Sequence, residues 1–170
     1  FGTLSARLPS ALASLFLMLM IGDTLFCWPQ KSDRQFLTPI VASLGFALSP
    51  LIIIWSRTAV SDALLTGTLG ISLLLFWRRM ASENNDQCIS AWVFLGFAIL
   101  VKGPVAFVLA LLTITSFLFC QKNWETLLSK INPKKGFLIT TLISVPWYIL
   151  ELLKEGKPFW DNFFGYHNFQ

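Results

Sequence analysis

Arg57 and Asp62 are the ionisable residues of a short segment, Ser56–Asp62, that separates two long apolar runs. Residues 37–54 before the segment are almost free of charge, and residues 63–77 after it carry none. Because runs of this kind are typical of membrane-spanning helices, the segment marks a membrane boundary. A charge at such a boundary is costly and usually functional. The pair is therefore the first candidate for a site that handles a charged group.

Lys102 ends another apolar run and is followed directly by Gly103 and Pro104. Glycine permits a sharp turn, and proline suits the first position of a helix. An ammonium group beside the start of a helix can bind a phosphate, so Lys102 could hold an anionic headgroup. The same residues could also serve only as an interfacial anchor and a turn, and both interpretations stay open.

The other candidate residues also have simple structural explanations. Asp62 could cap the helix that follows it, because the helix dipole and free backbone N–H groups favour a carboxylate there. Arg57 could extend its guanidinium group to the membrane surface. His167 is the sole histidine, and one histidine cannot form a metal site by itself. A structural hydrogen bond is its commoner role, with contact to a substrate as the alternative.

The composition excludes an ordinary soluble domain. Hydrophobic residues make up 55% of the 170 residues and charged residues only 13%, which is typical of a polytopic membrane protein. A nucleic-acid partner is excluded because the chain has no basic run with interleaved aromatic residues. The phosphate-loop, dinucleotide-binding, serine-hydrolase and zinc-protease motifs are absent as well. The sequence therefore predicts an all-α bundle of transmembrane helices.

Six spanning helices fit the apolar runs of a single transmembrane domain. We expect them at residues 8–27, 36–55, 59–77, 88–102, 104–120 and 136–153. The loops after the first, third and fifth helices, including the lysine-rich Lys122–Lys135, hold eight of the 13 Lys and Arg residues. The positive-inside rule places these loops in the cytoplasm. Arg57, Asp62, Lys102 and the C-terminal residues then share the opposite side of the membrane.

Five segments of the chain match a known family in the order in which that family has them. They are RLPSAL at residues 7–12, SRTAVSD at 56–62, VKGPVA at 101–106, VPWY at 145–148 and FGYHNF at 164–169. With these segments the chain resembles the integral-membrane GT-C glycosyltransferases. The closer similarity is to the bacterial branch of aminoarabinose transferases, which is related to the protein O-mannosyltransferases.

The resemblance implies transfer of a sugar from a polyisoprenyl-phosphate carrier to a lipid A-like lipid, a glycan or a protein. The reaction would take place on the periplasmic face of the bacterial inner membrane. The resemblance makes Asp62 the catalytic carboxylate, either as a general base or as a ligand of a divalent metal ion, the one cofactor considered. Arg57 and Lys102 would bind the carrier phosphate. His167 and Asn168 would bind substrate in the same cavity.

The family's first span and its large acidic loop would precede Phe1, and further spans would follow Gln170. We therefore expect the sequence to be an internal fragment that is inactive on its own. The alternative function is a secondary transporter or lipid flippase with Arg57, Asp62 and Lys102 along a substrate path. Charges in such proteins usually lie near the middle of the membrane, whereas these lie at the ends of spans. A structural membrane scaffold is the third alternative.

Overall fold

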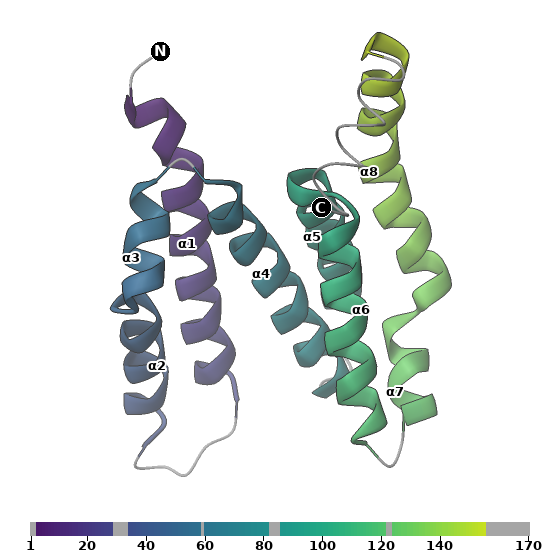
Figure 1. Cartoon of the computed structure of the whole chain (residues 1–170). Coiled ribbons are helices and arrows are strands. Elements are labelled where there is room, and N and C mark those ends of the chain that lie inside the picture. The colour runs from purple at the N-terminus through teal and green to yellow at the C-terminus, as the bar shows by residue number, and fades with distance from the viewer. Residues whose placement is uncertain (1–2, 29–33, 59, 82–85, 122–123, 156–170) are drawn as a thin grey trace.

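The computed structural model describes residues 3–28, 34–58, 60–81, 86–121 and 124–155. The elements within these ranges are all α-helices (Figure 1). They are α1 (Thr3–Phe26), α2 (Leu37–Ala47), α3 (Pro50–Arg57), α4 (Ser61–Ala81), α5 (Asp86–Lys102), α6 (Pro104–Phe119), α7 (Trp124–Ile131) and α8 (Pro133–Glu155). Each of the six stretches expected to be helical contains a helix, and the all-α prediction is confirmed.

The stretch expected as one helix at residues 36–55 is broken, and α2 and α3 meet at an angle of 59°. Pro50 is the first residue of α3 and follows Ser49, which has extended backbone angles. A proline lacks the N–H that would continue the helical hydrogen bonds and disfavours helical angles in the residue before it. The helix is therefore interrupted at Ser49 and continues from Pro50 in a new direction.

The prediction of a loop at Lys122–Lys135 is wrong, because this segment contains α7 and the start of α8. The apolar residues Leu127, Leu128 and Ile131 recur at helical spacing in α7, and Ile131 is buried in the bundle. Packing of this short apolar face stabilises the helix. The lysines around it had favoured the prediction of a loop.

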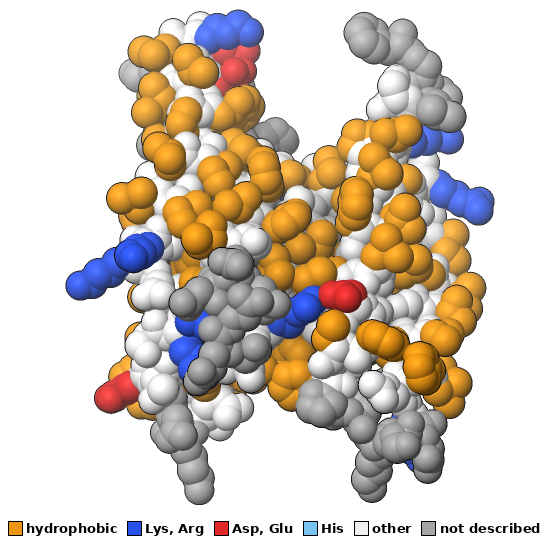
Figure 2. All heavy atoms as spheres, turned by 180° about the vertical axis from the view of Figure 1, so that it is seen from behind, with side chains coloured by type: hydrophobic (Ala, Val, Ile, Leu, Met, Phe, Trp, Pro, Cys, Tyr) orange, Lys and Arg blue, Asp and Glu red, His pale blue; other side chains and the backbone are white. Residues whose placement is uncertain are grey.

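Among the residues that the structure describes, two stretches are long and apolar enough to cross a membrane: Ser5–Phe26, and Trp124–Glu155, which joins α7 and α8. The bent pair α2–α3 would make a third, while α5 and α6 are apolar but shorter. Large apolar side chains cover much of the outer surface, with Leu153 78% and Phe119 93% exposed, and Figure 2 shows them spread over one face. Such a surface suits lipid, not water. The chain is a multi-pass membrane protein.

Helices α4 and α5 pack along each other at the centre of the bundle, with α1 against α4 and α8 against α5 (Figure 1). The core between them includes Phe76 and Trp92, whose rings meet edge to face at 4.9 Å between centroids. Trp92 also lies directly over Gly136 of α8, where an added Cβ would come within 1.9 Å of the indole ring. Glycine is required there because no side chain fits between the indole ring and the helix.

The two ends of the bundle differ in what they hold. Arg57, Asp62 and Lys102 lie at one end, here called the Asp62 end, and the joint between α7 and α8 lies at the other, here called the Arg79 end (Figure 1). The positive-inside prediction required that Arg57, Asp62 and Lys102 share one side, and this arrangement is consistent with it.

The Arg79 end is closed by side chains that donate to the last carbonyl groups of α7. Arg79 Nε donates to the Lys130 carbonyl over 3.1 Å, and Trp92 Nε1 and Cys88 Sγ both donate to the Ile131 carbonyl over 2.9 Å. The last carbonyls of a helix lack partners within it, so these bonds satisfy groups that would otherwise be costly to bury.

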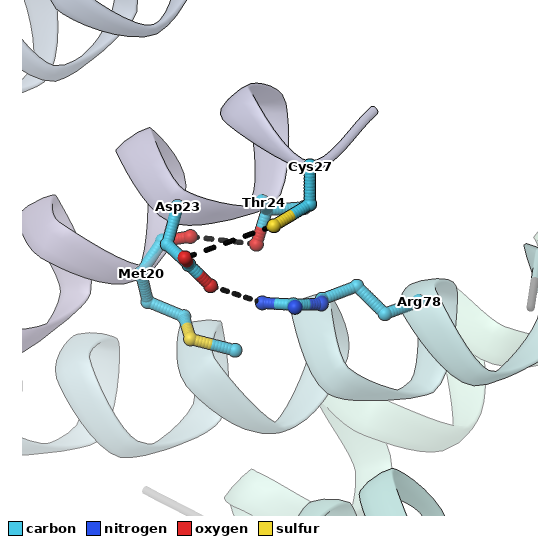
Figure 3. A network of polar contacts seen from close by, with 5 residues as sticks. All are labelled: Met20, Asp23, Thr24, Cys27 and Arg78. Carbon is cyan, nitrogen blue, oxygen red and sulfur yellow. Dashed lines mark hydrogen bonds and ion pairs between the residues drawn. The ribbon is translucent and has the colours of Figure 1, made fainter. Parts of the chain in front are cut away.

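A more exposed ion pair joins α1 to α4 at this end. Arg78 Nη1 lies 2.5 Å from Asp23 Oδ2, and the Asp23 side chain is 56% exposed. Figure 3 shows Asp23 between Arg78 and Cys27, with the Thr24 hydroxyl donating to the Met20 carbonyl in the same turn. Exposed pairs of this kind contribute little to stability.

Candidate functional site

Asp62 and Lys102 form an ion pair between Lys102 Nζ and Asp62 Oδ1, although 40 residues separate them in the chain. Asp62 lies in the first turn of α4, and Lys102 is the last residue of α5. The side chains are 34% and 42% exposed, respectively. The pair is therefore held in place by the fold and remains accessible to a ligand.

The helices themselves favour each charge of this pair. The N-terminal end of a helix has a partial positive charge and the C-terminal end a partial negative one. Asp62 lies at the start of α4, and Lys102 lies at the end of α5, which packs against α4. Each charge thus lies at a helix end that favours it, but this does not explain why both charges meet at one point.

The turn after Lys102 depends on glycine. Gly103 has φ 69° and ψ −146°, a conformation that L side chains rarely adopt. Its N–H donates to the Ile99 carbonyl over 2.7 Å, and Pro104 follows as the first residue of α6. The expected sharp turn is therefore confirmed, and it fixes where α5 ends.

The remaining predicted residues are not joined to the pair by any contact that the structure describes. Arg57 is the exposed last residue of α3, and within the described ranges its guanidinium makes no hydrogen bond or ion pair. His167 and Asn168 lie outside the described residues. Of the predicted site residues that the structure describes, it brings together Asp62 and Lys102.

A divalent metal ion finds no ligand set in the described part of the chain. No three or more His, Cys, Asp or Glu side chains there are grouped so that they could hold an ion, and the Asp62 carboxylate has Lys102 as its partner. Divalent ions such as Mg²⁺ and Ca²⁺ are held by several oxygen ligands. The described residues therefore do not by themselves supply the ligand set of such an ion.

Two residues that the sequence did not single out are bonded to the backbone beside the pair. Ser10 Oγ donates to the Val60 carbonyl over 3.4 Å, and the Tyr148 hydroxyl donates to the Ile99 carbonyl over 2.7 Å. Both belong to segments that carried the family resemblance. The sequence did offer one signal for both residues. Each is a polar residue within an apolar span, and a polar group in a membrane needs a hydrogen-bond partner.

An open apolar groove of about 820 Å³ runs along α8 from Lys134 to Leu150. Its lining is almost entirely aliphatic and aromatic, with Lys134 at one end, and it includes neither Asp62 nor Lys102. The groove is suited to an apolar chain, whereas the ion pair is suited to a charged group.

The profile of the dolichyl-phosphate-mannose-protein mannosyltransferases matches residues 1–150. The chain belongs to this mannosyltransferase family. The family resemblance that the sequence predicted is confirmed, and it covers all segments that build the Asp62–Lys102 pair.

Individual relatives share modest sequence identity with this member of the mannosyltransferase family. An undecaprenyl phosphate-alpha-4-amino-4-deoxy-L-arabinose arabinosyl transferase of Pseudomonas fluorescens is 25% identical over 99% of this chain and 30% of its own length. One from Yersinia pestis is 22% identical over 100% of the chain and 29% of its own length. An uncharacterized protein of Aquifex aeolicus is 31% identical over 96% of the chain and 35% of its own length.

The chain thus spans about a third of the length of these relatives. No solved structure gives a significant match.

Proposed function

We propose that the full-length protein is a glycosyltransferase that moves a sugar from a polyprenyl-phosphate carrier to a cell-envelope acceptor. The acceptor would be a lipid A-like lipid, a glycan or a protein, and the reaction would occur at the periplasmic face of the bacterial inner membrane. The observation that carries the proposal is the accessible Asp62–Lys102 pair, built from two segments of the family. The names of the arabinosyl transferase relatives support an undecaprenyl-phosphate carrier.

The pair offers the two functions that such a transfer needs. The Lys102 ammonium binds the phosphate of the carrier and stabilises the negative charge that grows there as the bond between the sugar and the phosphate breaks. Binding of the phosphate takes Lys102 away from Asp62, which leaves the carboxylate able to accept a proton. Asp62 then removes the proton of the acceptor hydroxyl as its oxygen attacks the anomeric carbon. The products are the glycosylated acceptor and the polyprenyl phosphate.

Arg57 would supply a second cation for the phosphate, since it ends α3 at the same end of the bundle. His167 and Asn168 would contact the acceptor or the sugar from the C-terminal part of the chain. The groove on α8 supports a lipid substrate, because it offers an apolar path on the helix whose Tyr148 contacts the end of α5. The sequence would then act as one part of a longer transmembrane enzyme.

The test is transfer of labelled sugars from undecaprenyl-phosphate donors to envelope acceptors by the purified full-length protein. Product should form with the natural protein and disappear in Asp62→Asn and Lys102→Ala, while both variants still insert in the membrane. Glu155→Gln and Lys154→Ala are matched controls, since both residues are exposed at the end of α8, and they should keep full transfer. Full activity of Asp62→Asn and Lys102→Ala would overturn the site, and no product with any donor would overturn the function.

The alternative of a transporter or flippase draws support from the broken pair α2–α3, because discontinuous spans often form substrate paths in transporters. The break at Leu48 and Ser49, however, contains no ionisable residue. A flippase would move labelled undecaprenyl phosphate across a vesicle membrane without an acceptor. The proposed transferase would not, and the same purified protein serves for both assays.

A further inference from the structure

Two side chains outside the ion pair connect its two halves to the outer helices of the bundle. Ser10 belongs to α1 and reaches the link between α3 and α4, whereas Tyr148 belongs to α8 and reaches the end of α5. Each bond ends on a backbone carbonyl within three residues of a member of the pair. Four of the five segments that resemble the family thus meet at one place.

Tyr148 acts on the part of α5 that carries Lys102. The Ile99 carbonyl, one turn before Lys102, accepts both the Tyr148 hydroxyl and the N–H of Gly103, each over 2.7 Å. The same acceptor therefore defines the end of α5 and its distance from α8. In an apolar environment a hydroxyl without a partner is costly, so this bond favours one position of the α5 end over others.

Ser10 contacts the backbone near Asp62, as Tyr148 contacts the backbone near Lys102. Its side chain is buried, with 2% exposure, and its hydroxyl donates to the Val60 carbonyl two residues before Asp62. At 3.4 Å this bond is longer, and therefore weaker, than the bond of Tyr148. It links α1 to the chain just before the start of α4, so it limits the movement of the first turn of α4.

We infer that Ser10 and Tyr148 are positioning residues that set the geometry between Asp62 and Lys102, an inference that rests on the function proposed for that pair. Neither residue touches the substrate in this role. Tyr148 positions the cation that holds the carrier phosphate, and Ser10 positions the carboxylate that takes the proton.

The test of Tyr148 is the affinity of the full-length protein, in lipid nanodiscs, for undecaprenyl phosphate. Tyr148→Phe should raise the dissociation constant about fivefold, because it removes one hydrogen bond that holds the end of α5. The matched control is Thr140→Val, since Thr140 Oγ1 also donates from α8 to a carbonyl of α5, that of Trp92, over 3.1 Å. Both variants should lower the melting temperature similarly, but only Tyr148→Phe should weaken binding. Equal weakening in both variants, or none in Tyr148→Phe, would overturn the inference for Tyr148.

The test of Ser10 is the rate of sugar transfer. Ser10→Ala should lower kcat about threefold, because one weak hydrogen bond is lost, and should leave the dissociation constant of undecaprenyl phosphate unchanged. The control is Ser14→Ala in the same helix, because the buried Ser14 hydroxyl donates only to the Ser10 carbonyl within α1 in the contacts described. An equal loss of kcat in Ser14→Ala would show that Ser10 is merely structural.

Lys102→Ala separates this inference from the function on which it rests. If Lys102→Ala binds undecaprenyl phosphate as tightly as the natural protein, the proposed site is wrong. If Lys102→Ala loses binding while Tyr148→Phe matches Thr140→Val, the site stands and the positioning role is wrong.

Discussion

The buried Arg79 side chain at one end of the bundle and the Asp62–Lys102 pair at the other show opposite solutions for charge in a membrane protein. At the Arg79 end, the Arg79 side chain is 7% exposed and donates to the Lys130 carbonyl of α7. At the Asp62 end, the charges of Asp62 and Lys102 face each other and are about a third or more exposed. A buried donor to the backbone stabilises the helix that it contacts, whereas an exposed pair can exchange its partner for a ligand. The buried donor thus stabilises the Arg79 end, and the proposed function places the chemistry at the Asp62 end.

The largest effect on activity should follow from the loss of a charge at the Asp62 end. Lys102→Ala should lower the transfer rate about 10³-fold, because a group that stabilises developing charge in a transition state is lost. The melting temperature of the full-length protein should stay within about 2 °C, since the pair is accessible and exposed pairs add little stability. Sugar transfer and thermal unfolding, measured on the same preparation, check this. A large drop in the melting temperature would mean that the pair is structural and would remove the contrast.

The largest effect on stability should arise where Trp92 covers Gly136. Gly136→Ala places a methyl group within 1.9 Å of the indole ring and should lower the free energy of unfolding by about 3 kcal/mol, because a packed core cannot make room for it. Unfolding in mixed detergent micelles measures the change. Gly45→Ala in α2 is the control, since an added Cβ there meets nothing within 4 Å. If both variants unfolded alike, close packing would not be the reason for glycine at position 136.

A smaller loss of stability should follow from Arg79→Met. The substitution leaves the Lys130 carbonyl without its Arg79 donor and should lower the free energy of unfolding by about 2 kcal/mol. Binding of undecaprenyl phosphate should not change, because the Asp62 end keeps all its contacts. The measurements are unfolding in mixed micelles and the binding assay. Weakened binding at unchanged stability would show that the two ends are coupled.

The smallest effect is expected for the adjacent Arg78→Met. Arg78 pairs with Asp23, whose side chain is 56% exposed, so its loss should change the free energy of unfolding by less than about 1 kcal/mol. Comparison with Arg79→Met tests whether burial, and not the charge alone, determines how much an arginine contributes to the free energy of unfolding. A larger loss for Arg78→Met than for Arg79→Met would contradict the distinction drawn at this end.

The sequence predicted the elements better than the contacts between them. Apolar runs bounded by charges located the helices, and the turn at Gly103 followed from glycine and proline chemistry. Pro50 was a local signal for the bend, but the length of the apolar run around it favoured one continuous helix. The helical spacing of Leu127 and Ile131 in α7 was likewise hidden by the surrounding lysines.

The candidate site was only partly accessible to sequence reasoning. Asp62 and Lys102 stood out because each is a charge beside an apolar run, but nothing in the sequence shows that they touch. The roles of Ser10 and Tyr148 depend on which carbonyl each hydroxyl reaches, and that is decided by the packing of α1 and α8. Contacts of this kind join residues about 50 positions apart, and no local pattern encodes them.

The short helices α5 and α6 have a consequence for the lipid around them. With 17 and 16 residues, they extend about 26 Å and 24 Å at about 1.5 Å per residue, less than the roughly 30 Å of a hydrocarbon core. A spanning helix of this length is accommodated by a thinner bilayer, by flanking residues that reach the surface or by association with other helices. A thinner bilayer would bring the headgroup level towards the turn at Gly103. On the proposed function, a carrier phosphate at that level would meet Lys102 without entering hydrocarbon.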